Sequence, residues 1–105
     1  LQVIVVDNEQ HDTARLKAEL PGVKIVPSAG NLGFAGGCNL GVEYATGDVL
    51  AFLNNDARAD RNWIRTAIRV FHAEPTVGAV ASKVLDWDGK KIDFVDGGLT
   101  WFYKE

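Results

Sequence analysis

The chain opens with LQVIVVDN (residues 1–8), a mostly apolar run that ends in the polar pair Asp7-Asn8. The run is rich in β-branched side chains and does not alternate strictly between polar and apolar positions. That pattern predicts a strand covered on both faces, as in a parallel sheet. Parallel strands are joined by long crossover connections, so a helix is expected to follow Asp7-Asn8.

The rest of the chain alternates between helix and strand signals. Helices are predicted from Asp12 or Thr13 to residue 20, after the glycine-rich segment 28–41 as far as residue 46, and from Asp60 or Asn62 to residue 73. Strands are predicted at residues 23–26, 49–53 and 77–85, with a hairpin turn at residues 86–92. This order predicts an α/β fold, a three-layer sandwich with a mostly parallel sheet.

Composition and charge exclude several classes of function. The net charge is −3 and no stretch is strongly basic, so a nucleic-acid partner is not expected. The single cysteine, Cys38, excludes an internal disulfide and fits a reducing compartment, which predicts a cytoplasmic location. With Cys38, His11 and His72 as the only soft ligands, a structural zinc site is not expected. No apolar run is long enough for a transmembrane segment.

Polar residues follow the predicted strands at the points where those strands end. Asp7-Asn8 follows the first strand, residues 54–56 (Asn-Asn-Asp) follow the strand at 49–53, and the glycine-rich segment 28–41 follows the strand at 23–26. Ligands of open α/β sheets bind beyond the carboxyl ends of the strands. We therefore expect these three features to lie on one rim of the sheet and to form one site.

The glycine-rich segment 28–41 has two interpretations. Its glycine spacing fits neither the dinucleotide fingerprint nor the P-loop, so it can be a loop that allows close packing of helix on sheet. Alternatively, Asn31 and Asn39 lie beside flexible backbone and a helix start, where N–H groups and the helix dipole favour an anion. Spacing alone does not separate these interpretations.

Asp56 is the candidate metal ligand. A carboxylate at the end of an apolar strand suits a hard divalent ion such as Mg²⁺ or Mn²⁺, which completes its shell with diphosphate oxygens and water. Taken alone, Asp56 and Asp7 can equally be turn or capping residues.

Four segments together resemble a known family. Residues 3–8 (VIVVDN), 31–39 (NLGFAGGCN), 45–48 (ATGD) and 52–56 (FLNND) are similar in order and spacing to family 2 glycosyltransferases of the GT-A fold, in particular to a rhamnosyltransferase-like subgroup. The resemblance implies a nucleotide-sugar donor as the ligand. It implies that Asp7, with Asn8 beside it, contacts the nucleotide base, that Asn31, Gly33 and Asn39 line the nucleotide pocket, and that Asn54 and Asp56 belong to the metal-binding Asp-x-Asp motif with Mn²⁺ or Mg²⁺.

The sequence departs from the family in three respects. Asn54 replaces the leading acid, which leaves Asp56 as the charged ligand and predicts weaker metal binding. The family's first strand and its acceptor-binding half, with the catalytic base, have no counterpart in residues 1–105. The chain is therefore interpreted as the donor-binding portion of one glycosyltransferase domain, with its catalytic residues unknown. An exposed strand edge beside residues 1–6, together with apolar residues at 101–103, predicts a homo-oligomer.

Two main functional hypotheses follow. The first is part of a metal-dependent, inverting glycosyltransferase that acts in surface or cell-wall polysaccharide assembly, in the cytoplasm or at the inner face of the membrane. The second is a non-catalytic α/β module that binds nucleotide or a protein partner only. A flavodoxin-type module accounts for Asp7 and Asp56 but not for the segment from Asn31 to Asn39.

Overall fold

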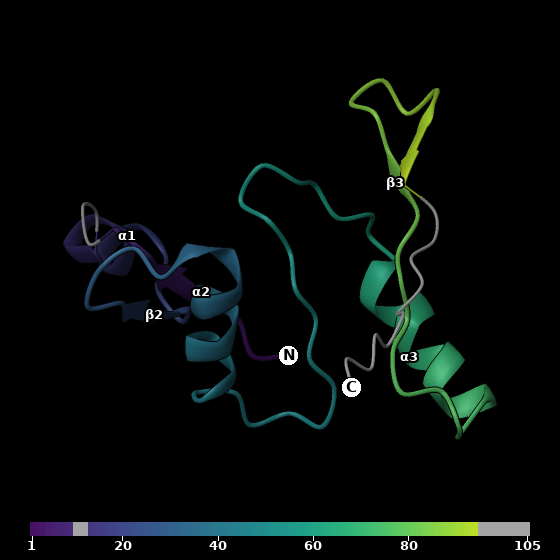
Figure 1. Cartoon of the computed structure of the whole chain (residues 1–105), viewed down its shortest axis with the longest axis horizontal. Coiled ribbons are helices and arrows are strands. Elements are labelled where there is room, and N and C mark those ends of the chain that lie inside the picture. Colours follow the sequence, from purple (N-terminus) through teal and green to yellow (C-terminus); the bar gives the residue numbers. More distant parts are fainter. Residues whose placement is uncertain (10–12, 95–105) are drawn as a thin grey trace, which may run out of the picture. The chain divides into compact units, whose positions relative to one another are not determined.

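The computed structural model describes residues 1–9 and 13–94, and the chain divides into two compact units, residues 1–58 and 59–105 (Figure 1). Each unit is described by itself. Two predicted features, Asp12 as a helix cap and the apolar residues 101–103, lie outside the described residues.

The first unit is built on a parallel pair of strands. Strand β1 (Ile4–Asp7) leads through helix α1 (Thr13–Glu19) to strand β2 (Lys24–Pro27), and helix α2 (Gly33–Val42) follows. The two strands pair in parallel, with Ile4 opposite Lys24 and Asp7 opposite Pro27. This confirms the parallel pairing and the crossover helix that the sequence predicts.

The core of the first unit lies on β2. Ile25 and Val26 are buried, with exposed fractions of 7% and 4%, and Ser28 just after the strand is 2% exposed. Helix α1 packs on β2 and helix α2 packs on β1. On α1 only Leu16 of the predicted inner face is half-buried, whereas Ala14 and the following Leu20 are exposed.

Helix α2 begins earlier than predicted and contains most of the glycine-rich segment. Glycines at 33, 37 and 41 recur every fourth residue, which places them on one side of a helix. A Cβ atom at Gly41 would lie 3.2 Å from Val6 Cγ2, and one at Gly37 would lie 3.8 Å from the side chain of Asn8. The glycine face of α2 therefore allows close packing on β1, as the first interpretation of the segment predicted.

The predicted strand at residues 49–53 is not a strand in this structure (Figure 1). Its apolar side chains are exposed, from 41% for Val49 to 53% for Phe52 and Leu53. A strand exists only where a neighbour completes its hydrogen bonds. Among the described residues, β1 pairs with β2 alone, and residues 49–53 pair with neither strand.

The second unit contains helix α3 (Trp63–Ala73) and a short hairpin of β3 (Val84–Leu85) and β4 (Ile92–Phe94). The strands pair antiparallel, and the turn between them includes Gly89 at a φ of 70°. The predicted hairpin turn is thus confirmed, but the predicted strand at 77–85 is reduced to its last two residues because β4 pairs with those alone. No helix among the described residues has the length and apolar character needed to cross a membrane.

Replacing Gly41 with valine tests the contact between α2 and β1. We expect Gly41→Val to lower the free energy of unfolding by about 1–3 kcal/mol, because the new side chain overlaps Val6. Ala35→Val, at an exposed position of the same helix, should cost only about 0.5 kcal/mol through helix propensity. Urea unfolding followed by circular dichroism measures both. Equal losses for the two variants would contradict close packing at Gly41.

Candidate functional site

Asp7 connects the end of β1 to two neighbouring segments. Its carboxylate accepts a hydrogen bond from the hydroxyl of Thr13, the first residue of α1. Its main-chain oxygen accepts a hydrogen bond from the Ser28 N–H at 3.1 Å, and Ser28 Oγ lies 3.3 Å from the same oxygen. The position of Asp7 at the carboxyl end of β1 is therefore set by both α1 and the segment that follows β2.

Asn8 connects the end of β1 to the turn that precedes α2. Its Oδ1 accepts a hydrogen bond from the main-chain N–H of Leu32 at 3.0 Å. Its Nδ2 donates to the main-chain oxygen of Gly33 at 3.2 Å and to Asn31 Oδ1 at 3.1 Å. We call the side chains of Asn8 and Asn31, with the main chain of Leu32 and Gly33, the amide clamp.

Asn31 completes the amide clamp from the other side. Its Oδ1 also accepts a hydrogen bond from the Gly33 N–H at 2.9 Å, and its Nδ2 donates to Glu9 Oε1 at 3.4 Å. Gly33 has a φ of 68°, a conformation that L-residues rarely adopt, so glycine suits this turn. The turn Asn31–Gly33 is therefore held by the side chain of Asn31 and by the side chain of Asn8.

The assembled group consists of two carboxylates, Asp7 and Glu9, and the two carboxamides of the amide clamp. It offers hydrogen-bond acceptors and donors but contains no cationic side chain. Such a group can recognise the polar edge of a heterocyclic base through directional hydrogen bonds. Its charge is unsuited to holding a phosphate.

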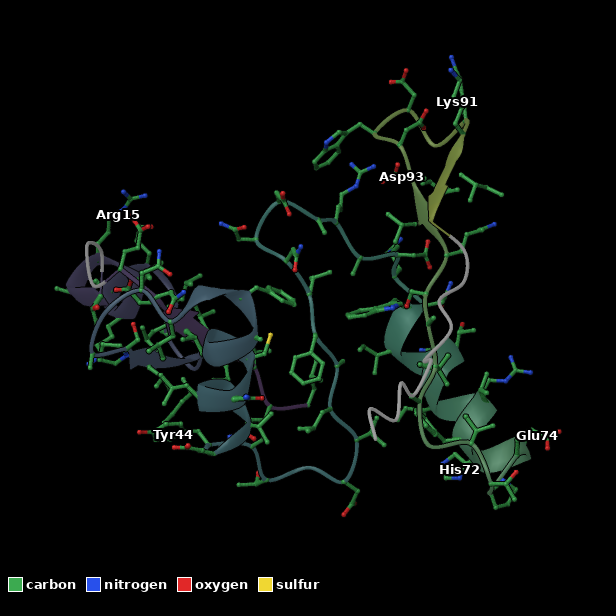
Figure 2. All side chains as sticks on the ribbon, viewed as in Figure 1. Arg15, Tyr44, His72, Glu74, Lys91 and Asp93 are labelled. Carbon is green, nitrogen blue, oxygen red and sulfur yellow. The ribbon has the colours of Figure 1, made fainter. Side chains whose placement is uncertain are left out.

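The other end of α2 is attached to the start of the chain by a second carboxamide. Gln2 Nε2 donates to the main-chain oxygen of Tyr44 at 3.1 Å, and Gln2 Oε1 accepts from the N–H and the hydroxyl of Thr46 at 3.0 and 3.1 Å. Tyr44 lies just after α2 (Figure 2). Lys24 Nζ lies 4.9 Å from the centroid of the Tyr44 ring. Both ends of α2 are thus hydrogen-bonded to residues that flank β1.

The structure brings together Asp7, Asn8, Asn31 and Gly33 but not the other predicted site residues. Asn39 is exposed and lies two positions after Gly37, about 200° around the helix from the face that packs on β1. Asn54 and Asp56 lie in an exposed turn, in which the Ala57 N–H donates to the main-chain oxygen of Asn54 at 3.1 Å. Within the described part of the chain, no hydrogen bond joins that turn to the amide clamp.

The described residues contain no group of three or more His, Cys, Asp and Glu side chains that could hold a metal ion. The turn at residues 54–56 would offer a metal ion two of the predicted ligands, the Asp56 carboxylate and the Asn54 carboxamide. That number is compatible with Mg²⁺ or Mn²⁺, which keep several waters and take substrate phosphate oxygens as ligands.

Sequence reasoning missed the parts of Ser28 and Glu9 in this site. Ser28 is nearly fully buried, and its hydroxyl donates to the main-chain oxygen of Gly30 at 2.6 Å. A serine directly after a short apolar strand gives no signal of burial by itself. The position of Glu9 directly after Asp7-Asn8 is a sequence signal from which its part in the site could have been predicted.

Comparison with models of known protein families gives a match over most of the chain. The profile of "Glycosyl transferase family 2" matches residues 1–94. The chain belongs to glycosyl transferase family 2. Family 2 membership implies the GT-A nucleotide-sugar transferase fold, of which the parallel strands and helices of the first unit are a part.

A curated relative in family 2 is a glucosyl-dolichyl phosphate glucuronosyltransferase of Haloferax volcanii. It is 30% identical to this chain over 103 residues, which cover 94% of the chain and 33% of the relative. The chain thus spans about a third of the length of the curated relative that it matches. No solved structure matches the chain significantly.

Removing the buried hydroxyl of Ser28 tests how the family 2 site is held together. We expect Ser28→Ala to lower the free energy of unfolding by about 1 kcal/mol, because the part-buried hydrogen bond from the Ser28 hydroxyl to the main-chain oxygen of Gly30 is lost. Thr76→Ala, at an exposed position in the second unit, should change it by less than about 0.5 kcal/mol. Thermal and urea unfolding measure both changes. A Ser28→Ala variant as stable as the original chain would contradict this role.

Proposed function

We propose that this chain is the donor-binding portion of a glycosyltransferase domain and that it binds the nucleotide of a nucleotide-activated sugar. The observation that carries the proposal is the convergence of Asp7, Asn8 and the turn Asn31–Gly33 at the carboxyl end of β1, in a chain of family 2. Ligands of parallel sheets bind at this end of the strands.

In this proposal Asp7, Gly33 and Asn39 contribute to nucleotide binding in different ways. The Asp7 carboxylate accepts a hydrogen bond from the nucleotide base, and Gly33 lets the ligand approach the main chain closely. Asn39 belongs to the pocket by its place in the family pattern, and its position on the outer face of α2 makes its contribution the least direct.

The reaction in the parent protein is the transfer of a glycosyl group with inversion at the anomeric carbon. The oxygen of an acceptor hydroxyl attacks the anomeric carbon, and the bond between that carbon and the diphosphate oxygen breaks. The proton of the hydroxyl passes to a base. The nucleoside diphosphate leaves with the bonding electrons. No residue of this chain is assigned as that base.

Asn54 and Asp56 are the residues proposed to hold Mn²⁺ or Mg²⁺. The ion, when bound with the donor, neutralises charge that develops on the departing diphosphate. Because Asn54 contributes no charge, Asp56 alone supplies the electrostatic attraction for the ion. We therefore expect weaker metal binding than two carboxylates would provide.

The proposal also covers the sugar that is transferred, the acceptor that receives it and the place where the reaction occurs. The wording of residues 31–37 supports a rhamnosyltransferase-like subgroup, whereas the relative from Haloferax volcanii is named for a glucuronosyl donor and a lipid-linked glucosyl acceptor. Both names describe glycan extension by transfer to a sugar or lipid-linked sugar. We propose an acceptor of this class in surface-polysaccharide assembly, with the donor supplied from the cytoplasm.

Metal-dependent nucleotide binding tests the proposed function. We expect the affinity for UDP, GDP or dTDP to rise when Mn²⁺ is added, because Asp56 would hold the ion and the ion would supply positive charge for the diphosphate. The gain should disappear in Asp56→Ala but remain in Asp48→Ala, which removes a nearby exposed carboxylate that the proposal does not use. Isothermal titration calorimetry with Mn²⁺ or with chelator measures the gain. Equal affinities with Mn²⁺ and with chelator would remove the metal role, and binding of none of the three nucleotides would reject the function.

We also propose that two copies of the chain associate through β1. The main-chain oxygens of Val3 and Asp7 accept hydrogen bonds from residues of or next to β2. Main-chain groups alternate in direction along a strand, so those of Ile4 and Val6 face the other edge. Within the described part of the chain nothing pairs with that edge, and an open edge is a template for a second strand.

Substitutions at Ile4 test this association. Ile4→Pro removes a main-chain donor from the outer edge without removing a hydrogen bond to β2, so we expect it to shift the chain from dimer to monomer. Ile4→Ala keeps that donor and should remain a dimer. Light scattering after size exclusion, with circular dichroism to verify folding, gives the mass. A monomer at micromolar concentration before any substitution would reject the association.

A further inference from the structure

The side chain of Asn8 is used almost completely by the amide clamp. A carboxamide offers two N–H donors and one acceptor oxygen. In Asn8 the oxygen binds Leu32 N–H, and Nδ2 has acceptors at 3.2 Å on Gly33 and at 3.1 Å on Asn31. The side chain is also half-buried and lies beside Gly37, where a Cβ would come within 3.8 Å of three of its atoms. Little of Asn8 is left to contact a ligand.

The amide clamp replaces a helix cap at the start of α2. Leu32 is the N-cap residue and its side chain makes no capping hydrogen bond. The first N–H groups of a helix have no partner within the helix, and a cap normally satisfies one of them. Here Asn8 Oδ1 binds the N–H of Leu32, and Asn31 Oδ1 binds the N–H of Gly33. Asn8 reaches this turn from a position 25 residues earlier than Gly33.

We propose that Asn8 is a positioning residue for donor binding: it holds the turn Asn31–Gly33 and the start of α2 in place beside Asp7, and it does not itself contact the nucleotide. The inference rests on the proposed function, because it concerns the same pocket. Its physical basis is preorganisation. A turn that is already held in the binding geometry does not have to be ordered when the ligand binds. The entropic cost of binding is therefore lower and the affinity is higher.

A pair of matched substitutions separates positioning from direct contact. Asn8→Asp replaces Nδ2 by an oxygen that faces two acceptors, Asn31 Oδ1 and the Gly33 main-chain oxygen, so two hydrogen bonds are lost. Asn31→Asp keeps the Oδ1 that accepts from Asn8 and from Gly33 N–H, and replaces the 3.4 Å hydrogen bond to exposed Glu9 by a repulsion between two carboxylates. Both variants add one negative charge to the same site, so repulsion of a diphosphate is matched.

A third variant controls for general loosening of α2. Gln2→Glu makes the same amide-to-acid change at the other end of the helix, where Gln2 Nε2 donates to the main-chain oxygen of Tyr44. It should lower stability by an amount similar to that for Asn8→Asp, without reaching the turn before α2.

Two measurements on the full chain are made for each variant. Hydrogen exchange followed by NMR reports the amide protons of Leu32 and Gly33 individually, and calorimetry with UDP, GDP and dTDP in Mn²⁺ reports affinity at a temperature where every variant is folded. In Asn8→Asp we expect both amide protons to exchange roughly 10-fold faster and the affinity to fall roughly 10-fold. In Gln2→Glu both quantities should stay within about 2-fold of the original chain, whereas Asn31→Asp should keep the amide exchange within about 2-fold and lose less affinity than Asn8→Asp.

The outcomes separate this inference from the proposed function. Equal losses of affinity in Asn8→Asp and Asn31→Asp overturn the positioning role in favour of direct contact or charge. An equal loss in Gln2→Glu overturns it in favour of a general structural effect, and unchanged affinity in Asn8→Asp overturns it outright. If the original chain binds none of the nucleotides, the proposed function fails and the positioning role falls with it. Hydrogen exchange then still shows whether Asn8 holds the turn.

Discussion

The close approach of α2 to β1 is the constraint on which the candidate site depends. Gly37 and Gly41 present main chain where other residues would place side chains against Asn8 and Val6. Glycine inside a helix costs about 1 kcal/mol relative to alanine, so α2 is a poor helix by local propensity. The helix therefore relies on packing against β1 and on hydrogen bonds at its two ends, to Asn8 and Gln2.

The same hydrogen bonds serve the fold and the site. Asp7 is held through its main-chain oxygen by Ser28 and through its carboxylate by Thr13, so the residue proposed to read the base is also a junction between β1, α1 and the segment after β2. Asn8, next in sequence, joins β1 to the turn before α2. Two adjacent residues thus hold the segment between β2 and α2 at two points, and a change at either alters fold and site together.

The contrast between residues 1–42 and residues 49–53 shows what a strand requires. Residues 1–6 and 49–53 are both apolar and both predict strands. The first run has β2 as a parallel neighbour across one short crossover, and it forms β1. The second run is exposed and irregular, and no described strand pairs with it. Hydrophobicity marks a segment as suited to a sheet, but the neighbouring strand makes it one.

Local patterns were sufficient to predict the parallel pair, the crossover helix, the hairpin turn and the family. These features depend on residues close together in the chain, or on motifs such as NLGFAGGCN at 31–39 whose wording is specific. The amide clamp was beyond sequence reasoning, because Asn8 and its partners are more than 20 residues apart and meet only when α2 packs on β1. Likewise, Asn39 is exposed because α2 packs on β1 with its glycine face. Which face of a helix is buried depends on the neighbour against which the helix packs.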